Sequence, residues 1–235
     1  MERLNRFLAR NGVASRRNAD KMIAEGQVKV NGEVVDRLGT TINPDNDVVT
    51  CNGVTVKAVK PVYIMFYKPK GCITTKKDEL GRKTIFDYVT VDVAGLVPVG
   101  RLDYETEGLL LLTNDGQLAH ALTHPSHEIP KTYVVKVVGE VPENNLAQLR
   151  KGVLVDGVKT KRSKVKLLEY KDGISKIQVT IYEGRNRQIR KMFEAIDKEV
   201  IFLKRTAVAD LRLGGLSRGG YRYLNDFEID YLKRL

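Results

Sequence analysis

The sequence predicts an α+β protein in which a small helix-rich module precedes a larger domain with a mostly antiparallel sheet. Residues 1–60 carry two short helical patterns followed by hairpin signals, and residues 61–235 carry more strand patterns than helical ones. The strands of the larger part do not alternate regularly with helices, as they would in a doubly wound parallel fold. At roughly 100–200 residues per domain, 235 residues suffice for two domains.

The first module begins with two predicted helices. Leu4 and Leu8 lie at helical spacing, and Gly12 is a suitable stop for that helix. Ser15 is a typical N-cap and predicts a second helix that ends at Gly26. The module therefore opens as helix, turn, helix.

Two Asn-Gly pairs predict the strands that complete this module. Asn31-Gly32 and Asn52-Gly53 each lie between apolar stretches, which is the strongest short signal for a β-hairpin. A linker over 57–62, which contains Pro61, follows. We therefore place the first module at 1–60 and the second domain at 61–235.

The charge of the chain points to a polyanionic partner. The net charge is +11, and residues 1–29 alone hold seven basic side chains against three acidic ones. A basic helical face of this kind either binds phosphates or is a solvated amphipathic face, and charge alone favours neither. If it binds RNA, the contact residues are Arg3, Arg6, Arg10, Ser15, Arg16, Arg17, Lys21 and Lys29.

The larger domain is predicted from strand patterns and one clear helix. Candidate strands cover 62–67, 132–138, 164–168, 174–181 and 200–204. The helix spans 187–196, with an apolar face that repeats at helical spacing, and a shorter helix covers 118–122. The basic segment 150–166 is either an RNA-contacting edge or a strand that its charges keep soluble, and we favour RNA contact.

An acidic loop is the first candidate for chemistry. Asp103, Glu105 and Glu107 lie in a glycine-bounded loop that runs into four consecutive leucines. A loop anchored by a rigid apolar strand can hold a catalytic side chain still. The alternative is that all three acids are solvated and that Asp103 caps a turn.

Two further segments carry polar residues in structured surroundings. Tyr133 sits in an alternating strand, where it is either a functional ring or an ordinary half-buried aromatic. The run 185–191 gathers basic side chains at the start of a helix, where cations are disfavoured unless an anion accompanies them.

These segments, in this order, resemble known families over essentially the whole chain. The runs 9–17 and 26–32 are similar to the small RNA-binding module of ribosomal protein S-four. Gly-Arg-Leu-Asp at 100–103, Lys-Thr-Tyr at 131–133 and Glu-Gly-Arg-Asn-Arg-Gln-Ile-Arg at 183–190 resemble pseudouridine synthases of the RsuA/RluB branch. The resemblance implies that a uridine in ribosomal RNA is isomerised to pseudouridine, without a cofactor or a metal.

The resemblance also implies a role for individual residues. Asp103 would act at the sugar, Tyr133 would stack on the uracil and accept the C5 proton, and Arg190 would pair with the aspartate. Arg101 would enter the space that the flipped uridine leaves, and Leu203 would pack beneath the tyrosine. Arg187 and Gln188 belong to the same motif and are expected to bind substrate.

The target and the partners follow from the same resemblance. Within the branch, the chain is most similar to enzymes of the large ribosomal subunit, so 23S rRNA is the expected target, and small-subunit 16S rRNA is the alternative. A non-catalytic RNA-binding assembly factor is the rival from another class. We expect a cytoplasmic monomer that acts on ribosomal RNA or on an assembly intermediate, with no membrane partner, since no apolar run is long enough to span one.

Overall fold

The computed structural model describes residues 1–235 and divides into two compact units. The first unit contains Met1–Tyr63 together with the short segments Val91–Val97 and Leu112–Gln117. The second unit contains Ile64–Thr90, Pro98–Leu111 and Leu118–Leu235. None of the helices combines the length and the apolar character that crossing a membrane requires.

The first unit confirms the two predicted helices. Helix α1 (Leu4–Arg10) is followed by α2 (Arg16–Ala24), and the Ser15 hydroxyl accepts a hydrogen bond from the backbone N–H of Asn18 at 3.3 Å. That bond satisfies one of the free N–H groups in the first turn of a helix, which explains why α2 starts there. The short strand β1 (Glu2–Arg3) pairs with β4 (Thr41–Ile42).

Both predicted hairpins are also present. Strands β2 (Val28–Val30) and β3 (Glu33–Val34) join at Asn31-Gly32, whose φ angles of 52° and 91° match the left-handed turn that Asn-Gly favours. Strands β5 (Val49–Cys51) and β6 (Val54–Thr55) form the second hairpin, and β5 pairs with β2. Buried residues from α1, α2 and these strands form the core of the module, among them Leu4, Phe7, Leu8, Ile23 and Val28.

The second unit is built on a nine-stranded mixed sheet, in agreement with the predicted fold class. Its main order is β13-β14-β10-β15-β9-β7-β17, with β8 beside β9 and β16 beside β15. The pairs β13/β14, β14/β10, β10/β15, β15/β16 and β7/β17 are antiparallel, and β9/β15 is parallel. The strands are β7 (Tyr63–Lys68), β8 (Val97–Val99), β9 (Glu107–Thr113), β10 (Lys131–Val138), β13 (Lys164–Lys171), β14 (Ile174–Ile181), β15 (Val200–Val208), β16 (Leu211–Arg212) and β17 (Tyr221–Tyr223).

Glycine permits the parallel contact between β9 and β15. Gly108 lies opposite Arg205 in the β9/β15 register, with a φ of 118°. A Cβ atom at this position would stand 2.1 Å from the carbonyl oxygen of Arg205, so any other residue would push the strands apart. This close approach brings the acidic loop before β9 next to the strand that carries Leu203.

The helices of the second unit only partly match the prediction. The helix predicted at 187–196 is α5 (Gln188–Glu194), and the short one is α3 (Gly116–Thr123), while Ile85–Asp87 and Pro125–His127 form 3-10 turns. Helices α4 (Glu143–Lys151) and α6 (Asp226–Lys233) were not predicted. Helix α4 is short, and its two leucines are too few to show a helical period. In α6, Phe227, Ile229 and Tyr231 alternate with acids, which is the period of a strand rather than of a helix.

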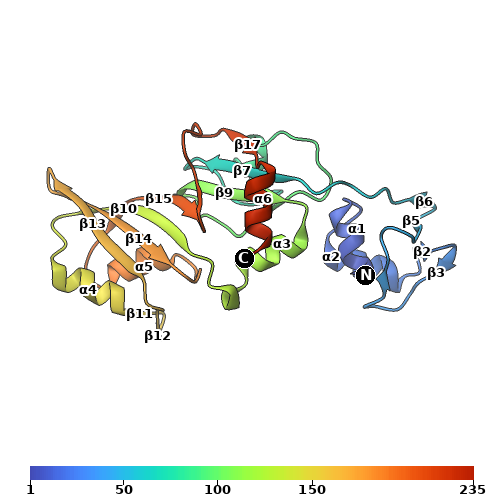
Figure 1. Ribbon diagram of the computed structural model, residues 1–235, viewed down its shortest axis with the longest axis horizontal. Helices are drawn as coiled ribbons and strands as arrows, with labels where there is room; N and C mark the ends of the chain where they lie inside the picture. Colours follow the sequence, from blue (N-terminus) through green and yellow to red (C-terminus); the bar gives the residue numbers. More distant parts are fainter. The chain divides into compact units, whose positions relative to one another are not determined.

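The sheet presents two different faces. Residues that point to one face of β10 and β14, including Tyr133, Val135, Ile177 and Val179, are buried. Helix α4 packs against β13 and α5 against β15 and β11 (Leu154–Val155), which pairs with β12 (Val158–Lys159). Figure 1 shows α4 and α5 along the same side of these strands. We call the face of the sheet that carries these buried residues and both helices the inner face, and we call the opposite face of the sheet the open face.

Candidate active site

A pocket of about 410 Å³ opens on the inner face of the sheet in the second unit. Its volume falls within the range of pockets that hold small molecules or single nucleotides. The predicted residues Arg101, Asp103, Tyr133 and Leu203 line it, together with Arg187 and Gln188. Residues from four separated stretches of sequence therefore meet in one cavity.

Asp103 sits in a loop whose backbone is fixed at several points. The N–H of Thr106 donates to the carbonyl oxygen of Asp103 at 3.0 Å, which closes a turn. Next to it, the Thr74 hydroxyl donates to the carbonyl oxygen of Leu102 at 2.7 Å. The loop thus presents a half-buried carboxylate from a fixed backbone.

Lys68 at the end of β7 is the strongest support of this loop. Its side chain is fully buried, and its ammonium donates to the carbonyl oxygens of Pro69, Asp103 and Thr106 at 3.1, 2.9 and 3.0 Å. Burial lowers the pKa of Lys68, while the nearby carboxylate of Asp103 acts in the opposite direction. Sequence reasoning missed this residue, because a lysine that ends an apolar strand usually extends into solvent.

Tyr133 and Leu203 reach the pocket because their strands alternate. Tyr133 on β10 is opposite Arg205 on β15, and Leu203 is two residues earlier on the same face. Arg205 is only 3% exposed, and its Nε–H donates to the carbonyl oxygen of Leu109 at 2.7 Å. Burial and the neighbouring charge of Arg205 lower the pKa of Lys131 to about 8. Arg205 and Lys131 line the pocket but were assigned no role from the sequence.

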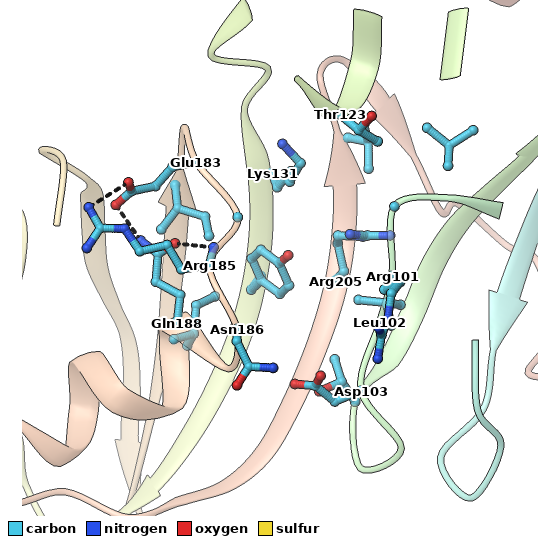
Figure 2. Close-up of a pocket in the computed structure, with 18 of the residues that line it drawn as sticks. Arg101, Leu102, Asp103, Thr123, Lys131, Glu183, Arg185, Asn186, Gln188 and Arg205 are labelled. Atoms are coloured by element: carbon cyan, nitrogen blue, oxygen red, sulfur yellow. Dashed lines mark hydrogen bonds and ion pairs between the residues drawn. The ribbon is translucent and has the colours of Figure 1, made fainter. Parts of the chain in front are cut away.

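The loop before α5 forms the facing wall of the pocket. The Gln188 side chain donates to Glu183 at 2.7 Å and accepts from the backbone N–H of Arg185 at 3.0 Å. Gln188 is buried, so both ends of its amide are used to hold the loop. Figure 2 shows these contacts and shows the amide of Asn186 and the carboxylate of Asp103 directed toward each other from opposite walls.

Arg190 lies beside the pocket rather than among its lining residues. Its guanidinium donates to the carbonyl oxygens of Val200 at 2.8 Å and Glu105 at 3.3 Å. Burial lowers the pKa of Arg190, and the charges of Asp103 and Glu105 raise it. Arg190 makes no ion pair with Asp103 in this structure, but it contacts the same loop two residues further along.

Of the other three pocket arginines, Arg185 pairs with Glu183 at 3.2 Å, and the remaining two are exposed cations. Arg101 precedes the Asp103 loop, and Arg187 occupies the N-cap of α5 with a φ of 50°. Neither side chain forms an ion pair. Both are therefore available to an anionic ligand.

The other acids of the loop have different surroundings. Glu107 is 2% exposed, accepts a hydrogen bond from the Tyr67 hydroxyl at 2.8 Å and pairs with Arg218 at 3.1 Å. Glu105 is exposed and does not line the pocket. Glu183 lines the pocket but is held by Gln188 and by the backbone N–H of Lys161 at 2.9 Å. Asp103 is thus the pocket carboxylate with no side-chain partner.

The predicted RNA-contact residues of the first unit fall into two groups. Arg3, Arg16, Arg17, Lys21 and Lys29 are exposed. Arg6 is half-buried, Arg10 pairs with Glu2 at 3.2 Å and packs over the Phe7 ring, and Ser15 caps α2. The exposed cations of α2 are therefore the part of this set with the greatest freedom to bind phosphate.

The pocket combines one available carboxylate, a phenol and several cations. A carboxylate of this kind can attack or stabilise an electron-poor carbon, and the phenol can stack on a flat ring and exchange a proton. The surrounding cations suit a ligand that carries phosphates. This set fits chemistry on a nucleotide.

Comparison with known proteins agrees with this chemistry. The RNA pseudouridylate synthase family matches residues 62–195, and the S4 domain matches residues 2–49. The chain is 48% identical over its full length to ribosomal large subunit pseudouridine synthase B of Bacillus subtilis strain 168, covering 97% of that protein. It is 40% identical over 98% of its length to an RNA pseudouridine synthase of Aquifex aeolicus strain VF5, covering 93% of it.

A solved structure extends the similarity to three dimensions. A crystal structure of a pseudouridylate synthase matches with a TM-score of 0.71 and 35% sequence identity, over 99% of this chain and 100% of the other. Family, full-length relatives and fold agree with one another. The chain therefore belongs to the RNA pseudouridylate synthase family and carries an S4 domain at its N-terminal end.

Proposed function

We propose that this protein isomerises a specific uridine of large-subunit 23S ribosomal RNA to pseudouridine. The main support for the proposal is the carboxylate of Asp103, which has no side-chain partner and lines the same pocket as the Tyr133 ring. The loop that carries Asp103 is held by a hydrogen bond from Lys68. The target follows from the relative in Bacillus subtilis, which is named for the large ribosomal subunit. Small-subunit 16S rRNA is the second candidate.

The reaction assigns a role to each pocket group. The N1–C1′ bond of the uridine breaks, the uracil turns within the pocket, C5 bonds to C1′, and the proton on C5 is transferred to N1 by way of a protein group or water. Asp103 acts at the sugar, either as a nucleophile toward C1′ or by removing a sugar proton. Tyr133 stacks on the uracil, and its hydroxyl is placed to accept the C5 proton.

The other predicted residues position the loop and the RNA. Arg190 holds the Asp103 loop through the carbonyl of Glu105 and keeps a positive charge near the carboxylate. Leu203 packs beneath the tyrosine, and Gln188 shapes the wall opposite Asp103. Arg101 and Arg187 are exposed at the pocket and suit the phosphates and the gap beside an everted nucleotide.

We further propose that the work is divided at residue 60. Residues 1–60 bind structured RNA through exposed cations such as Arg16 and Arg17, and residues 61–235 carry the reaction. The protein acts as a cytoplasmic monomer on ribosomal RNA or on an assembly intermediate. We expect no cofactor, because the isomerisation neither adds nor removes atoms or electrons.

Mapping pseudouridine in ribosomal RNA tests this proposal. In cells that lack the protein, one site in 23S rRNA should lose its pseudouridine and regain it with the wild-type gene, but not with Asp103→Asn. Loss of a site in 16S rRNA would move the target to the small subunit. An unchanged map of both RNAs, or full rescue by Asp103→Asn, would contradict the proposed activity or the role of Asp103.

A further inference from the structure

The open face of the catalytic sheet carries rows of polar side chains set by strand register. Residues directly opposite each other in neighbouring strands share a face. Lys164, Thr180 and Thr132 form one such row. Lys166, Gln178, Val134 and Lys204 form the next, and Glu169, Lys176, Lys136 and Phe202 form the third. Together, the three rows place five lysines on one surface.

These five lysines have almost no compensating charge. None of Lys136, Lys164, Lys166, Lys176 and Lys204 takes part in a salt bridge. Two acids lie in these rows: Glu169, and Glu107, which is opposite Lys204 on β9 but is buried and pairs with Arg218 at 3.1 Å. Lysines elsewhere in the same unit do find partners, since Lys161 pairs with Glu128 and Lys191 with Asp156, each at 2.5 Å. The open face therefore carries a local excess of positive charge.

One pair of lysines on the open face lowers the stability of the sheet. Lys136 on β10 and Lys176 on β14 are directly opposite each other, and like charges in that arrangement destabilise a sheet. The fold offers Lys136 only the ring of Phe202, whose centroid lies 5.6 Å from its ammonium. A bound polyanion would remove the repulsion, which gives this arrangement a physical reason.

The face also has a shape and a set of donors that suit phosphates. A second pocket on it is lined by Lys164, Lys204, Arg212, Thr180 and Thr206. Asp210 also lines it, and its carboxylate accepts a hydrogen bond from the Tyr231 hydroxyl at 2.8 Å. Small hydroxyls beside lysines are the groups that commonly contact the nucleic-acid backbone. Protein–protein interfaces, by contrast, are depleted in lysine. The chemistry favours RNA over an acidic protein as the occupant.

We propose that the open face is a second RNA-binding surface, which holds backbone phosphates of the substrate RNA on the side of the sheet opposite the catalytic pocket. The surface consists of Lys136, Lys164, Lys166, Lys176 and Lys204. This inference rests on the proposed function for the identity of the RNA. It adds that the RNA extends past the edge strand β13 and contacts both faces of the catalytic sheet.

Chemical footprinting tests the surface in the intact protein. The wild-type chain is treated with an amine-acylating reagent with and without a 23S rRNA transcript, and the modified lysines are identified by mass spectrometry. We expect Lys164, Lys166 and Lys176 to be several-fold less modified when RNA is bound. Lys233 near the C-terminal end of α6 is exposed, lies outside the three rows and is the internal control. If these three lysines are protected no more than Lys233, the proposal is overturned.

A matched pair of variants provides the second test. Lys164→Gln/Lys166→Gln/Lys176→Gln removes three charges from the open face, and Lys198→Gln/Lys233→Gln/Arg234→Gln removes three charges elsewhere in the same unit. Each lost phosphate contact lowers the slope of log K against log salt by about 0.7–0.9, so the slope should fall by about two to three only for the first variant. An equal fall in both would show a general effect of net charge and would overturn the proposal.

The rate of isomerisation at saturating RNA separates this proposal from the proposed function. The open-face variant should keep the wild-type rate within about twofold, because Asp103 and Tyr133 lie on the other face. If the wild-type protein binds the transcript with a steep salt dependence but forms no pseudouridine in any ribosomal RNA, the proposed function fails and the footprint still decides the binding surface.

Discussion

The two faces of the catalytic sheet use positive charge in opposite ways. On the inner face, Lys68 and Arg205 are buried and donate to backbone carbonyls, so their charges are fixed within the protein. On the open face, Lys164 and Lys166 are exposed and have no partner in the fold. The same strands thus separate cations that hold a reactive loop in place from cations that are free to bind.

This difference follows from what each task requires. A reacting carboxylate needs a precise position, which buried hydrogen bonds to fixed backbone provide. A phosphate contact needs only a nearby charge on a flexible stem, and its strength is set by counterion release. Substitutions on the inner face should therefore change rate and stability, and substitutions on the open face should change RNA affinity and its salt dependence.

Asp103→Asn should have the largest effect. Removing the charge while keeping the shape should lower the single-turnover rate at least about a thousand-fold and leave RNA affinity within about tenfold, because affinity comes from phosphates and stacking. Glu105→Gln is the matched control, since it makes the same chemical change on an exposed acid of the same loop, and its rate should stay within about threefold. Equal losses in the two variants would remove the special role of Asp103.

Lys68→Met should have the next largest effect, on stability and rate together. The change leaves three buried carbonyls without their donor, which should lower the free energy of unfolding by about 1–3 kcal/mol. The rate should fall as the Asp103 loop loosens, with little change in RNA affinity. Denaturant unfolding measures the first effect, with the exposed Lys70→Met as control. A fully stable and fully active Lys68→Met protein would show that the three hydrogen bonds of Lys68 are dispensable.

Charge removal on the exposed helix of the first unit should act on binding alone. Arg16→Gln/Arg17→Gln should weaken RNA binding by about tenfold and lower the salt slope by about one and a half to two, because both side chains are free to contact phosphate. The rate at saturating RNA should not change. Arg37→Gln/Lys57→Gln, two exposed cations outside the helices, is the control. A lower saturated rate would argue that this helix also helps to place the target nucleotide.

The smallest effect concerns pH and Lys131. Its pKa in the folded protein is about 8, below the ordinary 10.5, because it is buried near Arg205. Between pH 8 and 10.5 the unfolded chain therefore binds the proton that the folded chain has lost, so this group makes the wild-type protein more stable as the pH rises. The stability of wild type relative to Lys131→Met should rise by about 1–3 kcal/mol across that window. A constant difference, as expected for an exposed Lys151→Met control, would contradict the low pKa.

The sequence predicted the fold where local signals were strong. Ser15 capped a helix as expected, and both Asn-Gly turns formed the predicted hairpins. Strand β14 was predicted with its observed bounds, whereas β13 and β15 extend further than the apolar pattern indicated. Their last residues are held by cross-strand pairing, which hydrophobic periodicity does not record.

The site was harder to predict because much of it is made by contacts between distant segments. The Asp103 loop and the cationic run 185–191 were visible as motifs, but the support of that loop by Lys68 depends on a contact across 35 residues of sequence. Arg205 was hidden in a strand whose alternation places it beside Leu203 on the inner face. The open face emerged only when strand register placed lysines from four strands together.

The separation of chemistry from binding is the central claim, and one paired measurement tests it most directly. Single-turnover rate at saturating RNA and RNA affinity are measured on the same transcript for Asp103→Asn and for Lys164→Gln/Lys166→Gln/Lys176→Gln. We predict that the first variant loses rate and keeps affinity, and that the second loses affinity and keeps rate. If both variants lose the same quantity, the two faces of the sheet do not divide the work and the account is wrong.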